Sequence, residues 1–89
     1  MTLTRELQIL NKAGIHARPA AMFVRLASKF QSDIFVAKDG EKVNGKSIMG
    51  LLMLAAGPGS RLQLEIVGPD AEKALLEIEA LINGRFGEV

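Results

Sequence analysis

The chain has 89 residues, a formal net charge of +1, no cysteine and one histidine. This length allows one domain with a small core, and the interspersed charges argue against a nucleic-acid surface. Without cysteine, disulfides and thiolate metal sites are excluded, and a single histidine makes a histidine-based metal site improbable. We therefore expect one domain over residues 1–89, with no metal and no other cofactor.

The sequence shows no basic segment followed by an apolar run, so we expect no export signal. Its apolar runs, such as residues 50–57, are too short to cross a bilayer. A chain without cysteine also suits a reducing compartment. These features predict a cytoplasmic protein without membrane insertion.

The first third of the chain predicts a strand, a loop and a helix. Residues 3–10 alternate between apolar and polar side chains, which is typical of a half-buried strand. Residues 11–14 read as a loop. From Ala17 to Phe30 the apolar residues recur at helical spacing, and Pro19 falls in the first turn, where its missing N–H costs little.

The middle of the chain predicts a hairpin and a short helix. Residues 34–36 belong to a second strand, and the Asp-Gly pair at residues 39–40 indicates a tight turn into a third strand over residues 41–44. Ser47 is a suitable N-cap for a helix over residues 48–55.

The last third predicts a strand and a long helix. Glycine and proline at residues 57–59 end the short helix, and residues 61–67 alternate as a fourth strand. Asp70 is expected to cap the final helix, whose end is indicated by Gly84. The apolar stripe of that helix consists of Ala71, Ala74, Leu75, Ile78, Leu81 and Ile82.

The predicted order is therefore strand, helix, strand, strand, helix, strand, helix. Strands with one apolar face need cover on that face only. The economical arrangement is an α+β fold in which one sheet is covered on one face by the helices.

The single histidine, His16, lies where the first loop meets the first helix. Gly14 permits a sharp backbone turn, and a helix N-terminus offers unpaired N–H groups and positive charge to an anion. Arg18 adds a guanidinium that can form two hydrogen bonds to phosphate oxygens. Both positive features favour an uncharged imidazole, whose free ring nitrogen is a nucleophile. This pattern suits a histidine that carries a phosphoryl group, although a lone histidine at a helix start is more often a plain surface residue.

Two sequence strings resemble motifs of the HPr family, the histidine-containing phosphocarriers of the bacterial phosphoenolpyruvate:sugar phosphotransferase system. Gly-Ile-His-Ala-Arg-Pro-Ala at residues 14–20 resembles the active-site motif. Val-Asn-Gly-Lys-Ser-Ile-Met-Gly at residues 43–50 resembles the regulatory-serine motif. Both occur at the family's spacing, and the order of elements matches over essentially the whole chain.

This resemblance implies an open-faced β-sandwich, in which a four-stranded antiparallel sheet carries three helices on one face. It implies a non-catalytic carrier that accepts a phosphoryl group on Nδ1 of His16 from phosphorylated enzyme I and passes it to a histidine of an enzyme IIA domain. Arg18 would assist on the phosphate side. Ala21 stands where several members carry threonine, and Ala13 lacks the side-chain hydrogen bond that some relatives make there. A monomer is expected.

The same resemblance makes Ser47 a candidate for regulatory phosphorylation by a bifunctional HPr kinase/phosphorylase. The helix after Ser47 has more apolar residues than one buried stripe requires, so part of it should be exposed for docking. The expected docking residues are Ala21, Ile48, Met49 and Leu52. Two interpretations stay open: a sugar-uptake carrier, or a mainly regulatory module of a nitrogen-related or Ser47-phosphate-dependent kind.

Overall fold

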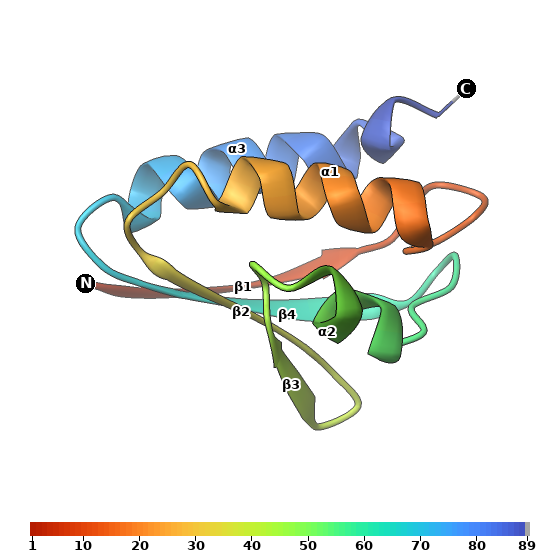
Figure 1. Ribbon diagram of the computed structural model, residues 1–89, viewed down its shortest axis with the longest axis horizontal. Coiled ribbons are helices and arrows are strands. Elements are labelled where there is room, and N and C mark those ends of the chain that lie inside the picture. Colours follow the sequence, from red (N-terminus) through yellow and green to blue (C-terminus); the bar gives the residue numbers. More distant parts are fainter. Residues whose placement is uncertain (89) are drawn as a thin grey trace.

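The computed structural model describes residues 1–88. Four strands and three α-helices alternate along the chain, and a short 3₁₀ helix follows them (Figure 1). Their bounds are β1 Thr2–Gln8, α1 Ala17–Ala27, β2 Asp33–Lys38, β3 Glu41–Asn44, α2 Ile48–Met53, β4 Arg61–Val67, α3 Ala71–Asn83 and η1 Arg85–Gly87. Each predicted strand and helix is present, in the predicted order.

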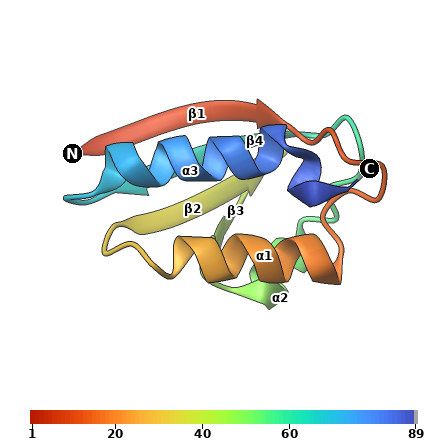
Figure 2. The same ribbon diagram turned by 90° about the horizontal axis from the view of Figure 1, so that it is seen from above.

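The strands form one antiparallel sheet in the order β1-β4-β2-β3. β4 lies between β1 and β2, so the last strand of the sequence completes the middle of the sheet. The helices α1 and α3 lie side by side over one face of this sheet, and α2 packs against α1 (Figures 1 and 2). The predicted open-faced sandwich is confirmed.

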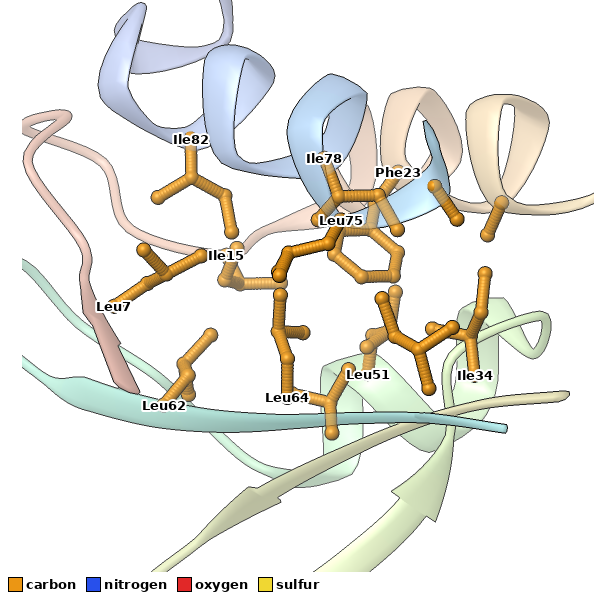
Figure 3. Close-up of a cluster of buried hydrophobic side chains, with 14 of the residues drawn as sticks. Leu7, Ile15, Phe23, Ile34, Leu51, Leu62, Leu64, Leu75, Ile78 and Ile82 are labelled. Carbon is orange, nitrogen blue, oxygen red and sulfur yellow. The ribbon is translucent and has the colours of Figure 1, made fainter. Parts of the chain in front are cut away.

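The core lies between the sheet and the helices (Figure 3). Alternation in β4 places Leu62, Leu64 and Ile66 on the covered face, where all three are buried. Phe23 from α1 and Ile78 from α3 are also buried and lie on the helix side of the layer that contains Leu62 and Leu64 (Figure 3). The apolar residues that recur at strand spacing and those that recur at helix spacing therefore pack together in one buried layer.

Two helices end earlier than their sequence patterns predict. The prediction for α1 ran to Phe30, but the helix stops at Ala27 and the chain tightens through a turn whose last N–H, that of Phe30, donates to Ala27 O at 3.2 Å. Phe30 still reaches the core, because a turn can continue an apolar stripe without continuing the helix. The helix α2 ends at Met53, and Ala55 adopts a left-handed conformation with φ of 52°.

Asp70 precedes α3 as predicted, but its side chain does not cap that helix. Its carboxylate instead accepts hydrogen bonds from Gln31 N at 2.9 Å, Ser32 N at 3.0 Å and Ser32 Oγ at 2.5 Å. These bonds join the α1–β2 loop to the start of α3. The hydroxyl of Ser32, followed by the backbone N–H groups of Gln31 and Ser32, lowers the pKa of Asp70 from 3.8 to about 2.

The Asp70 carboxylate makes the free energy of unfolding depend on pH in the acid range. Because the folded pKa is depressed, the stabilisation is present above about pH 4 and is lost as pH falls towards 2. We expect Asp70→Asn to lower the melting temperature at pH 7 and to match the wild type near pH 2, as followed by circular dichroism. A deficit of constant size across this range would contradict the assignment.

Candidate functional site

The loop before α1 is fixed by its backbone. Gly14 has φ of 68°, a conformation that L-residues rarely adopt. A Cβ at this position would lie 2.8 Å from Gly57 Cα and would also meet the carbonyl oxygen of Ala56. The next residue, Ile15, is buried and donates its N–H to Ala56 O at 2.7 Å. The loop is therefore clamped against the segment that follows α2.

His16 is the N-cap residue of α1, with extended backbone angles. Its carbonyl accepts the first helical bond, from Ala20 N at 3.0 Å, and its side chain is 49% exposed. Within residues 1–88, the N–H groups of Ala17 and Arg18 donate to no acceptor, and Pro19 has no N–H. A half-exposed imidazole thus stands beside free donors at the positive end of a helix.

Arg18 lies in the first turn of α1 and is exposed. Its guanidinium takes part in no hydrogen bond or ion pair in the described part of the chain. The positive charge two residues after His16 is therefore available to an anion.

A carboxylate next to His16 was missed by the sequence analysis. Glu88, in the segment after η1, places Oε2 3.7 Å from His16 Nε2. The same oxygen accepts a hydrogen bond from Nδ2 of buried Asn11 at 2.9 Å, and that amide also donates to Gly14 O at 2.8 Å. No local sequence motif indicates that Glu88 lies here, because 77 residues separate it from Asn11, which holds its carboxylate.

Glu88 carries a negative charge at neutral pH. The hydrogen bond from Asn11 lowers its pKa below the usual value, and the N–H of Ala13 and the imidazole of His16 contribute in the same direction. Partial desolvation acts against them. The sequence predicted a purely positive setting for His16, whereas the structure gives a mixed one.

Ser47 caps α2 as predicted, since its Oγ accepts a hydrogen bond from Gly50 N at 3.0 Å. After it, Ile48 is 41% exposed and Met49 is 67% exposed. Leu52 is only half-buried and packs partly on the core. The surface formed by Ile48, Met49 and Leu52, called here the α2 patch, is apolar and open to solvent on the side of the first two residues.

The α2 patch belongs to the same packed unit as His16. The helix α2 packs against α1, and the chain after α2 bonds to the His16 loop through Ile15 N and Ala56 O. Ala21, half-buried in α1, is the fourth expected docking residue. The helix packing therefore brings the elements that carry these residues together.

A surface depression lies over the uncovered face of the sheet, with Thr4, Phe35 and Lys42 among its walls, and His16 does not line it. Within residues 1–88, no cluster of three or more His, Asp or Glu could hold a metal ion. In the same span, no helix is long and apolar enough to cross a membrane.

Known proteins resemble the chain along nearly its whole length. The family described as "PTS HPr component phosphorylation site" matches residues 3–84. The phosphocarrier protein HPr of Neisseria meningitidis is 48% identical over 86 residues, which cover 97% of each chain.

Solved structures of two similar proteins have the same fold as this chain. A crystal structure of HPr from Thermoanaerobacter tengcongensis superimposes with a TM-score of 0.94 at 47% identity, covering 98% of each chain. Crh, a catabolite-repression protein of Bacillus subtilis, gives a TM-score of 0.76 at 43% identity, covering 91% of this chain and 93% of its own, and forms a swapped dimer. From these matches and the site around His16, the chain belongs to the HPr family of phosphotransferase-system phosphocarriers.

Proposed function

We propose that this chain is a phosphoryl carrier, in which His16 takes the group from phosphorylated enzyme I and gives it to a histidine of an enzyme IIA domain. The observation that carries the proposal is the half-exposed imidazole at the start of α1, next to free backbone N–H groups. Arg18 follows in the first turn, and its guanidinium has no partner within residues 1–88. Residues 1–89 would act as one HPr-like domain, in the cytoplasm with its partners.

The site suits transfer because phosphoryl transfer needs position and charge more than covalent chemistry from the protein. The N–H groups of Ala17 and Arg18 and the guanidinium of Arg18 can meet the phosphate oxygens. An acid–base pair or a nucleotide site is not required, since the partners supply the phosphoryl donor and the acceptor. The chain itself then turns over no substrate.

The α2 patch is the proposed docking surface for both partners, together with Ala21. Exposed apolar side chains beside a reactive group are typical of a recognition surface. We expect the complexes formed at this patch to be brief, because a carrier must leave each partner quickly. We expect the active carrier to be a monomer, because each partner needs the whole of this face.

Ser47 is the proposed regulatory site, modified by an HPr kinase/phosphorylase. A phosphate at this N-cap would be compatible with the helix, since helix N-termini stabilise anions. It would also set negative charge beside Ile48 and Met49. Regulation would then act on docking and leave the fold intact.

A mainly regulatory role is the second candidate, favoured by the similarity to Crh, a catabolite-repression protein. In that case phosphorylated Ser47 would recruit a partner and His16 would be dispensable. Partner binding that depends on Ser47 phosphate and survives in His16→Ala would decide for this role.

Incubation with enzyme I and phosphoenolpyruvate should add one phosphoryl group to the wild type. Intact-mass spectrometry should show no addition for His16→Ala, because no other imidazole is present. Arg18→Ala should slow the transfer at least about tenfold through loss of charge stabilisation, whereas Arg25→Ala at the far end of α1 should not. Phosphorylation of His16→Ala would overturn the proposal.

Negative charge at Ser47 should hinder transfer from enzyme I. Ser47→Asp keeps a capping oxygen and adds charge, and we expect about tenfold slower transfer. Ser47→Asn is the matched control, since it caps the helix without charge. Equal rates for the two variants would show that charge at this position is not regulatory.

The docking role of the α2 patch can be separated from stability. Met49→Glu changes an exposed side chain, so the free energy of unfolding should move by no more than about 0.5 kcal/mol. The KM for this chain as substrate of enzyme I should rise about tenfold with little change in kcat. Leu76→Glu, on an equally exposed residue of α3, should leave KM unchanged. If both variants behave alike, the patch is not the docking surface.

A further inference from the structure

The segment after α3 is shaped to bring Glu88 to His16. Phe86 is buried and anchors the segment to the core. Three consecutive residues, Arg85, Phe86 and Gly87, have φ of 58°, 53° and 76°. The left-handed conformation is unfavourable for the first two, and such strain persists only where surrounding contacts enforce it. The segment reaches the end of the molecule where α1 begins (Figure 2).

A buried amide holds the Glu88 carboxylate in place. Both neighbours of Asn11 Nδ2, the carbonyl of Gly14 and Oε2 of Glu88, are acceptors, which fixes the orientation of the amide. Asn11 Oδ1 is buried and has no hydrogen-bond partner within residues 1–88. The two hydrogen bonds that Nδ2 donates offset part of the free-energy cost of burying this amide.

The carboxylate distinguishes the two ring nitrogens of His16. Glu88 Oε2 lies 3.7 Å from Nε2, which is too long for a hydrogen bond but within the range of an ion pair. A negative charge beside Nε2 favours the proton on that nitrogen. The lone pair of the neutral ring then resides on Nδ1, whose bonds point away from the carboxylate.

We propose that Glu88, held by Asn11, is a positioning residue for His16 that keeps the ring proton on Nε2 and so makes Nδ1 the nitrogen that carries the phosphoryl group. The inference rests on the proposed function. On acceptance, the Nδ1 lone pair forms the N–P bond while the donor's bond to phosphorus breaks, and Nε2 keeps its proton. On donation, a ring nitrogen of the accepting histidine forms the new bond to phosphorus while the old N–P electron pair returns to Nδ1.

The retained proton matters most for donation. With Nε2 protonated, the ring leaves phosphorus as a neutral imidazole, whereas without that proton it would have to leave as an anion. The carboxylate stabilises the cationic ring of the phosphorylated state through charge. Repulsion between Glu88 and the phosphoryl group is limited, because the two groups lie on opposite sides of the ring.

The test uses Glu88→Gln, which keeps an oxygen for Asn11 and removes the charge. In ¹⁵N-histidine-labelled protein, the ring ¹⁵N shifts should show the Nε2–H form in the wild type and a shift towards Nδ1–H in this variant. Transfer from the phosphorylated chain to enzyme IIA should slow about two- to fivefold. Glu88→Asp should restore part of both effects, and Glu41→Gln, with the same change in net charge on β3, should resemble the wild type.

An unchanged tautomer in Glu88→Gln would overturn the inference whatever the transfer rates. If the wild type accepts the phosphoryl group and Glu88→Gln matches it in tautomer and rate, the positioning role falls and the proposed carrier function stands. If the wild type accepts none, the carrier function falls, and with it the role of Glu88 in directing the phosphoryl group to Nδ1.

Discussion

The backbone hydrogen bond from Ile15 to Ala56 is the constraint on which the site depends. It ties the loop before α1 to the chain after α2, at a point where Gly14 leaves no space for a side chain. With Ile15 buried on one side of this bond, His16 must begin the helix on the other. The same contact couples the geometry of the imidazole to the position of the α2 patch.

Charge around His16 is balanced between two sources. The start of α1 and Arg18 attract an anion, while Glu88 places a negative group beside the opposite ring nitrogen. A site with positive charge alone would hold a phosphate well, and a carrier must also release it. The carboxylate beside Nε2 lets the ring leave phosphorus as a neutral imidazole, which suits a group that is accepted and then passed on.

Much of the fold could be predicted from the sequence because its strands have one buried face. In β4 the alternation of Leu62, Leu64 and Ile66 sufficed to assign both the strand and its covered side. The structural role of Asp70 could not be predicted in this way, because the groups that donate hydrogen bonds to its carboxylate lie in the α1–β2 loop, far from it in sequence. A local sequence pattern can show where a helix begins. The groups that the side chain at this position binds depend on tertiary contacts, which the pattern does not contain.

The same limit applies to the site. His16 and Arg18 are close in sequence, and the start of α1 holds both, so a local motif was enough to single them out. Glu88 reaches the imidazole only through the left-handed turn after α3 and the amide of Asn11.

The most direct test of the central claim is the ³¹P–¹⁵N coupling in the phosphorylated, ¹⁵N-histidine-labelled chain. The account predicts phosphorus coupled to Nδ1 of His16; coupling to Nε2, or phosphorus bonded to no histidine nitrogen, would contradict it.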